Sequence, residues 1–304
     1  MSTSALVAPR FPRVTRYGTV ELGGTKTLVS VGVEPDDLAT PLMIPTTDPD
    51  SVLAQVCQYL VEHDLEAVGI ASFGPVELRS NHHLYGHITK TPKPGWSDTD
   101  VVGTVRRVVG LPVGFETDVN GSALGEGRWG AGVGFRQFVY MTVGTGIGAG
   151  LVVDGMPLHG AAHPEFGHVP VVRRHDDEFP GVCPFHGDCL EGMASGPALQ
   201  ARFGVAPPEL RGESVPVAVR LSAFYLAQGV RTLVYAVAPE RVIIGGGLSE
   251  LPGLLEAIRG ALVEELGGYP GLDHHADDGF VVATGLGRLS GLAGGLILAA
   301  GAIT

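Results

Sequence analysis

Two stretches of sequence decide the fold: residues 17–33, YGTVELGGTKTLVSVGV, and residues 138–154, FVYMTVGTGIGAGLVVD. Each predicts a strand, a glycine turn and a second strand, because β-branched and other apolar residues flank closely spaced glycines. The turns at Gly23 and Gly144 lie 121 residues apart, which indicates an internal repeat. We therefore expect two related halves, each led by a glycine-cornered hairpin, with a cleft between them.

The rest of the chain alternates between helix and strand patterns, which favours an α/β fold with largely parallel strands. We expect helices at 51–63, 98–109 and 253–266, a mainly helical stretch at 198–237 and a terminal helix, with strands at 67–71, 113–116, 241–244 and 281–284. The expected domains are a tail at 1–17, a smaller α/β domain at 18–117 plus about 282–304, and a larger α/β domain at 118–281. For the glycines of 285–295 we expect close helix packing.

The composition excludes several classes of protein. Of 304 residues, 46 are glycine and 22 proline, but 44% are hydrophobic and 17% charged, so the chain can bury a core and the glycine excess must be structural. A net charge of −12 without a long basic stretch argues against nucleic acid as a partner. No apolar run reaches the roughly 18 residues of a membrane span, so we expect no membrane partner.

The N-terminus and the cysteines indicate the compartment. Arg10, Arg13 and Arg16 precede the first acidic residue, as in a transit peptide, but without an apolar segment a polar tail is the favoured interpretation. Three cysteines are too few and too scattered for a disulfide framework, which fits a reducing cytoplasm.

Three glycine turns are candidate phosphate sites, since backbone N–H groups free of a Cβ can approach anionic oxygens. They are Gly23-Gly24-Thr25-Lys26, Gly144-Thr145-Gly146-Ile147-Gly148 and Gly245-Gly246-Gly247. The second contains GxGxG between two strands, where a dinucleotide site requires a strand followed by a helix, and no P-loop sequence occurs. Two of the turns would hold the β- and γ-phosphates and the third would lie against the nucleoside; the alternative for each is a tight hairpin.

A second cluster has the spacing of metal ligands. Cys183, His186 and Cys189 lie within seven residues, and one upstream histidine would complete a Cys2His2 set suited to Zn2+. His168 is the favoured fourth ligand over His163 and His175. Four protein ligands predict a closed, structural site; the alternative is a surface loop with incidental Cys and His.

Three carboxylates are candidates for chemistry. Asp118 follows a strand and precedes Asn120, where it could accept the proton of a hydroxyl that attacks phosphorus, or serve only as a turn or cap residue. Glu165 and Glu191 flank the metal cluster and could bind sugar hydroxyls; the alternative is ordinary surface acid. The chain also has only three lysines, Lys26, Lys90 and Lys93, which either sit where a compact ammonium is needed or survive by chance.

Taken together, these segments resemble the ROK family of sugar kinases, within the actin/hexokinase-like superfamily, and are most similar to its zinc-containing bacterial fructokinases. The resemblance spans about residues 18–295 in family order. HPEFGH and CPFHGDCLEGMASG are its most specific parts. The matching stretches are ELGGTK (21–26), SFGP (72–75), TKTPKPGW (89–96), TDVNG (117–121), residues 143–150, HPEFGH (163–168), CPFHGDCLEGMASG (183–196) and IGGG (244–247).

This resemblance implies an actin/hexokinase-like (ribonuclease H-like) duplicated two-domain fold and ATP- and Mg2+-dependent phosphorylation of a hexose by a homodimer. Asp118 would be the general base. The remaining roles follow the family motifs. The sugar would be bound by Gly74, Asn120, Glu165, His168 and Glu191; the nucleotide by Gly23, Gly24, Thr25, Lys26, Thr145, Gly146, Pro197, Gly245, Gly246 and Gly247; and one structural Zn2+ per chain by His168, Cys183, His186 and Cys189.

Departures from the wider family point to the sugar. Glu21 stands where the family usually has Asp, Thr117 where it usually has Asn, and the zinc loop has Cys2His2 in place of the commoner Cys3His. The fructokinase-like subgroup tends to share the first two changes, so we expect transfer to the 6-hydroxyl of D-fructose. A glucokinase or mannokinase is the alternative. A ROK-type repressor would need an N-terminal helix-turn-helix, for which some seventeen residues before Gly18 are too few, and a degenerate sugar-binding protein would not need Asp118.

Overall fold

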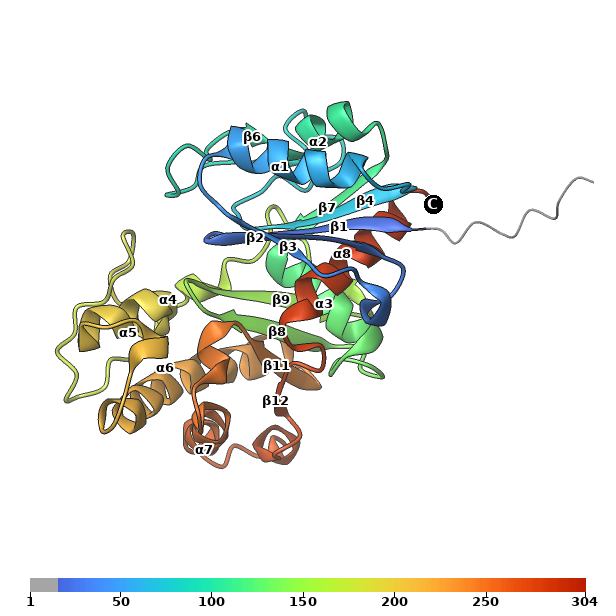
Figure 1. Cartoon of the computed structure of the whole chain (residues 1–304). Helices are drawn as coiled ribbons and strands as arrows, with labels where there is room; N and C mark the ends of the chain where they lie inside the picture. The colour runs from blue at the N-terminus through green and yellow to red at the C-terminus, as the bar shows by residue number, and fades with distance from the viewer. Residues whose placement is uncertain (1–15) are drawn as a thin grey trace, which may run out of the picture.

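Two five-stranded sheets form the frame of the molecule in the computed structural model, which describes residues 16–304 (Figure 1). The first sheet has the order β3-β2-β1-β4-β7. Its first three strands pair antiparallel and its last three pair parallel. The bounds are β1 Tyr17–Leu22, β2 Lys26–Gly32, β3 Leu42–Pro45, β4 Ala67–Ser72 and β7 Val113–Thr117.

The second sheet repeats this topology, in the order β10-β9-β8-β11-β12. Again three strands form an antiparallel meander and the last two join in parallel. This shared arrangement confirms the duplicated α/β fold expected from the two hairpins. The bounds are β8 Phe138–Val143, β9 Ile147–Val153, β10 Met156–Pro157, β11 Arg241–Gly245 and β12 Val281–Ala283, and a small third sheet pairs β5 His87–Ile88 with β6 Thr99–Asp100.

Helices cover the outer faces of both sheets and fill the space between them (Figure 1). α1 and α2 lie over the first sheet, α6 and α7 over the second, and α3 and α8 between the two. The bounds are α1 Pro49–Val61, α2 Val101–Val109, α3 Asp118–Trp129, α4 Leu190–Ala194, α5 Gly196–Phe203, α6 Ser214–Val237, α7 Leu254–Leu266 and α8 Ser290–Gly301, with 3-10 turns at Pro35–Asp37, Phe166–His168, Pro207–Glu209, Gly247–Glu250, Asp273–Ala276 and Gly287–Leu289.

Several elements differ from the sequence expectation, and the largest differences are at α2 and α3. The helix expected at 98–109 begins only at Val101, because Asp100 belongs to β6 and its carboxylate caps the helix by accepting from Gly103 N. The pattern also gave no sign of α3, whose inner face is built from small residues such as Gly121, Ala123 and Gly125. Without large apolar side chains at helical spacing, the sequence shows no amphipathic period there.

Glycines bring α8 into direct contact with its neighbours. A Cβ on Gly294 would overlap the carbonyl oxygen of Gly121 in α3, and one on Gly69 in β4 would overlap that of Gly295. Close helix packing therefore explains Gly294 and Gly295, as expected, whereas Gly287 precedes α8 and has a positive φ of 59° with open space around it. The buried Glu126 of α3 ties the same region together, since it accepts from the backbone N–H of Ala131, Gly285 and Leu286 and from the hydroxyl of Ser290.

The expected tail, residues 1–17, lies mostly outside the described residues 16–304. Arg10 and Arg13 lie outside the described residues, whereas Tyr17, the last residue of the expected tail, begins β1. Among residues 16–304, no helix combines the length and the apolar character needed to cross a bilayer.

Candidate active site between the two halves

A cavity of about 600 Å³ opens between the two hairpin turns. Both halves contribute to its walls, and Asp118 lies among the lining residues. The structure thus brings together most of the expected site. The expected residues that line the cavity are Gly23, Gly24, Thr25, Lys26, Gly74, Asp118, Thr145, Gly146, Glu165, His168 and Glu191.

The two glycine turns meet at this cavity, where the hydroxyls of Thr25 and Thr145 form a hydrogen bond of 3.2 Å. Each turn is closed by a backbone hydrogen bond, from Gly23 N to the carbonyl of Lys26 and from Gly144 N to that of Gly146. Paired turns of this kind leave backbone N–H groups and hydroxyls available to the oxygens of an anionic ligand.

The third turn lies beside the second and does not line the cavity. Gly246 has a φ of 85°, and a Cβ there would lie 2.5 Å from the carbonyl oxygen of Val143, so this corner requires glycine. A Cβ on Gly144 would be 3.7 Å from Gly247 N. Pro197 is likewise adjacent, because Gly196 N donates to the carbonyl of Gly144 at 2.7 Å. Gly245, Gly246, Gly247 and Pro197 therefore surround the second turn on the side of β11 and α5.

Asp118 is held at the point where β7 becomes α3. Thr117 is the N-cap, and its hydroxyl accepts from Asn120 N, while Val119 N donates to Asp118 Oδ1 at 2.9 Å. The pKa of Asp118 is raised to about 6; burial is the main cause, the nearby charge of Glu165 also raises the pKa, and the hydrogen bond from Val119 N lowers it. A carboxylate with this pKa is ionised at neutral pH and basic enough to accept a proton from a hydroxyl.

A second acid, Glu21 at the end of β1, lines the same cavity. Its pKa is raised to about 7, chiefly by burial and next by the charge of Asp118, while the ammonium of Lys26 acts in the opposite direction. A Cβ on Gly291 would lie 2.5 Å from the Glu21 carboxylate, so the first turn of α8 leaves room for Glu21 only because glycine stands there. Of the four acidic residues that line the cavity, Glu21 and Asp118 therefore form a pair whose charges repel.

Asn120, expected to contact sugar, is not among the lining residues. Its side chain is buried and donates to Glu116 Oε1 at 3.0 Å, next to Nε2 of His159 at 3.5 Å. These contacts place the Asn120 amide in a network that supports the start of α3 from behind Asp118. Within the TDVN motif, Asp118 therefore lines the cavity, whereas the side chain of Asn120 is buried in the interior.

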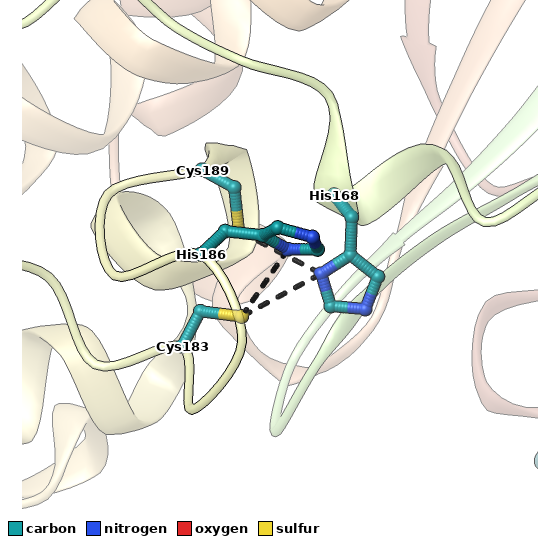
Figure 2. A group of neighbouring side chains, drawn as sticks. All are labelled: His168, Cys183, His186 and Cys189. Atoms are coloured by element: carbon teal, nitrogen blue, oxygen red, sulfur yellow. Dashed lines mark hydrogen bonds between the residues drawn. The ribbon is translucent and has the colours of Figure 1, made fainter.

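The four expected metal ligands converge in the structure (Figure 2). One ligand atom from each of His168, Cys183, His186 and Cys189 lies within 4.8 Å of the others. Nδ1 of His168 is 3.7 Å from the sulfur of Cys183 and 3.6 Å from that of Cys189. Tetrahedral zinc, with bonds of about 2.3 Å to sulfur and about 2.0 Å to nitrogen, requires S···N separations of about 3.5 Å. The donors and their spacing thus fit Zn2+.

The cluster connects directly to the cavity. His168 lines the cavity, and its Nδ1 points toward the sulfur atoms of the cluster. Cys189 is the N-cap of α4, and Glu191 lies in the first turn of that helix. Glu191 Oε2 accepts from Ile147 N at 2.9 Å, at the second glycine turn. A metal bound by these four residues would therefore fix the position of both Glu191 and that turn.

Several lining residues were not among the site residues expected from the sequence, although the sequence analysis had named them. Glu21 and His163 both line the cavity, and so does Lys90. Two of the three lysines thus lie at the site, whereas no arginine of residues 16–304 lines it. The lysine bias was the signal for Lys90; for His163 the available signal was its position two residues before Glu165.

Comparison with known proteins identifies the family. Residues 17–302 match the ROK family, so the chain belongs to it. It is 40% identical over 291 residues to a fructokinase of Zymomonas mobilis, covering 93% of this chain and 96% of the relative. A protein of Bacillus subtilis named as a putative fructokinase is 39% identical over 284 residues, covering 93% of this chain and 94% of the relative.

A solved structure supports the same assignment. The ROK family glucokinase of Streptomyces griseus, determined in complex with glucose and AMPPNP, superposes with a TM-score of 0.75 at 28% identity, covering 94% of this chain and 99% of that one. This likeness and the duplicated sheet topology confirm the actin/hexokinase-like fold, with a cavity between its two halves.

Proposed function

We propose that this chain is an ATP-dependent fructokinase, which transfers the γ-phosphoryl group of ATP to the 6-hydroxyl of D-fructose. The observation that carries the proposal is the position of Asp118 in a cavity at which the two glycine turns meet. The fructokinases of Zymomonas mobilis and Pediococcus pentosaceus, at 40% and 38% identity, support the choice of reaction and sugar.

In this reaction the carboxylate of Asp118 accepts the proton of the 6-hydroxyl as that oxygen attacks the γ-phosphorus. The new P–O bond forms as the bond to the β-phosphate oxygen breaks, and ADP leaves with that oxygen. Asp118 is suited to receive the proton because its pKa is raised. Positioning and electrostatic stabilisation supply most of the remaining acceleration in phosphoryl transfer.

The two turns are assigned to the phosphates. Gly23, Gly24 and Thr25 with the ammonium of Lys26 would bind from the first half, and Thr145 with Gly146 from the second. Pro197, Gly245, Gly246 and Gly247 would line the nucleoside, since they lie beside the second turn and outside the cavity.

Magnesium would enter with ATP. Its preferred ligands are oxygens, and the repelling carboxylates of Glu21 and Asp118 provide an environment in which a cation is favourable. When bound, Mg2+ neutralises charge on the phosphates. Within this chain, Glu21 and Asp118 would orient it.

The sugar is assigned to Gly74, Glu165, His168 and Glu191. All four line the cavity, and the last three offer carboxylate and imidazole groups to sugar hydroxyls. Asn120 supports Asp118 from the interior in this proposal. Zn2+ held by His168, Cys183, His186 and Cys189 would be structural, because four protein ligands leave no open position.

The domain assignment belongs to the same proposal: a smaller domain at 18–117 plus about 282–304, and a larger one at 118–281. α8 packs against β1, β4 and β7 of the first sheet, although it is the last helix of the chain (Figure 1). We also assign the working enzyme a homodimeric state and a cytoplasmic location, which sedimentation and localisation measurements would test.

A panel of sugars tests the proposed reaction. ADP release would be measured with fructose, mannose, glucose and N-acetylmannosamine at equal concentrations. We expect the highest kcat/KM with fructose. A higher value with glucose or mannose would favour a different hexose kinase, which the glucose-bound relative makes the second candidate. Negligible turnover with every sugar would refute the kinase itself.

A further inference from the structure

Residues 158–165 cross from the second half of the molecule to the first. They follow β10, and two histidines in them bond to residues of the first half. Nε2 of His159 is 2.7 Å from Glu116 Oε2 in β7. Nε2 of His163 accepts a hydrogen bond of 3.0 Å from Val76 N, which follows β4.

His163 is the more enclosed of the two. Its side chain is 7% exposed although it belongs to an irregular segment, whereas that of His159 is 44% exposed. It also lines the candidate active site, which His159 does not. A buried imidazole with a backbone partner is held in one orientation, so its position defines the wall of the cavity.

The hydrogen bond from Val76 also defines the tautomer of His163. A nitrogen that accepts from a backbone N–H carries no proton, so the proton of the neutral ring resides on Nδ1. Nδ1 lies 3.6 Å from Glu165 Oε1. The imidazole therefore directs an N–H group toward the carboxylate that the proposed function assigns to sugar binding.

His163 also touches the opposite wall. A Cβ on Gly74 would lie 3.2 Å from Cε1 and 3.4 Å from Nε2 of the ring. The ring consequently fills the space between residues 74–76 of the first half and Glu165 of the second. One side chain therefore lies between these two groups and contacts both.

We propose that His163 is a positioning residue that determines sugar specificity, by fixing the separation between residues 74–76 and Glu165 and by orienting the Glu165 carboxylate. The inference rests on the proposed function, since it concerns the sugar end of the same site. Hexoses that differ in ring size or in the orientation of a hydroxyl demand different separations between the groups that bind them. Loss of the ring widens the site and reduces discrimination among sugars.

Two substitutions at His163 and one control test this role. His163→Ala removes the ring, whereas His163→Gln retains an oxygen that can accept from Val76 N. His175→Ala is the matched control, because His175 is exposed and lies in the same long connection. KM and kcat for fructose, mannose and glucose, KM for ATP and the thermal midpoint are measured for each variant.

We expect His163→Ala to raise KM for fructose by about tenfold, the effect of losing one or two well-placed hydrogen bonds. The ratio of kcat/KM between fructose and mannose should fall, while KM for ATP stays within about twofold, because the nucleotide turns do not contact His163. His163→Gln should recover a substantial part of the fructose KM, and His175→Ala should match the wild type.

Calorimetric titration of the ATP-free protein with the same sugars separates this inference from the proposed reaction. If the wild type binds sugars but phosphorylates none, the proposed function fails, and a weaker, less selective sugar affinity in His163→Ala still supports the role of His163. Unchanged sugar affinity and preference in His163→Ala would overturn it. Equal losses for sugar and ATP together with a lowered thermal midpoint would also overturn it, because they indicate a purely structural role.

Discussion

The two halves share one topology but differ greatly in a single connection. In the first half, residues 46–48 link β3 to α1; in the second, residues 158–213 link β10 to α6. The short link braces its own glycine turn, since the hydroxyl of Thr46 donates to the carbonyl of Gly23 at 2.8 Å. In the second half, a residue of the long connection does this, as Glu191 accepts from Ile147 N.

This difference shows how function was divided between the repeats. Both halves retain the hairpin turn assigned to phosphate, but every metal ligand and three residues assigned to sugar lie in the long connection: Glu165, His168 and Glu191. The connection has little regular structure, with a five-residue α4 and an eight-residue α5 before α6. A metal cluster can supply the rigidity that a small core cannot.

The largest effect is expected at Asp118, where the first sheet passes into α3. Asp118→Asn should lower kcat by about 10³-fold, within the range for loss of a general base, because the amide cannot accept the proton of the hydroxyl. Sugar affinity should change much less. A coupled ADP-release assay and calorimetry with fructose measure the two effects.

Asp278→Asn is the control for that substitution, since Asp278 is exposed and outside the site. Full activity in Asp118→Asn would show that the two turns, and not this carboxylate, account for the chemistry.

Loss of a metal ligand should affect the long connection of the second half and leave the short connection of the first half unchanged. Cys183→Ser removes a thiolate ligand, so zinc should fall from about one per chain to near zero, and the thermal midpoint by roughly 5 °C or more. KM for the sugar should rise more than KM for ATP, because the sugar residues belong to the same connection. Metal analysis, thermal melting and steady-state kinetics measure these outcomes.

Cys57→Ser provides the comparison within the first half, as Cys57 is buried in α1 away from the cluster. The Cys57→Ser protein should retain its zinc. A Cys183→Ser protein that is metal-free yet has wild-type stability and sugar KM would end the argument that the metal stabilises the long connection.

The pH dependence of the reaction tests the raised pKa of Asp118, which lies in the cavity between the two halves. This pKa is raised to about 6, chiefly by burial, and only the ionised form of Asp118 can accept a proton. Activity should therefore fall as the pH decreases through about 6, with kcat/KM about tenfold lower at pH 5 than at pH 7. An acid limb centred near pH 4, measured on wild-type protein that remains folded, would contradict the effect of burial.

The smallest effects compare the two glycine turns directly. A Cβ on Gly146 would lie 2.8 Å from Glu191 Oε2, whereas one on Gly24 meets nothing within 4 Å. Gly146→Ala should displace Glu191 from Ile147 N, which costs about 1 kcal/mol of stability and raises the sugar KM several-fold. Gly24→Ala should leave the thermal midpoint and sugar KM unchanged. Equal effects of the two substitutions in melting and kinetics would show that both turns are braced alike.

Much of the site was predictable because its residues are close in sequence. Cys183, His186 and Cys189 share one loop, so their spacing alone indicated a metal site, and ligand chemistry added His168. Asp118 was indicated by its place after a strand. The position of Asn120 was not predictable, because the hydrogen bond that turns its amide toward Glu116 depends on the packing of α3.

By itself, the sequence determined the duplication, the three glycine turns, the candidate metal ligands and the membership of the ROK family. These features are local patterns of glycine, apolar periodicity and ligand spacing, and local patterns survive without knowledge of the fold. Only the tertiary structure decided that Thr25 faces Thr145, that Glu191 holds the second turn, and that His163 reaches Val76. Each of these contacts joins residues from separate elements, 120, 44 and 87 positions apart in the chain. The first and the third also join the two halves, so their geometry depends on how the two sheets pack around α3 and α8.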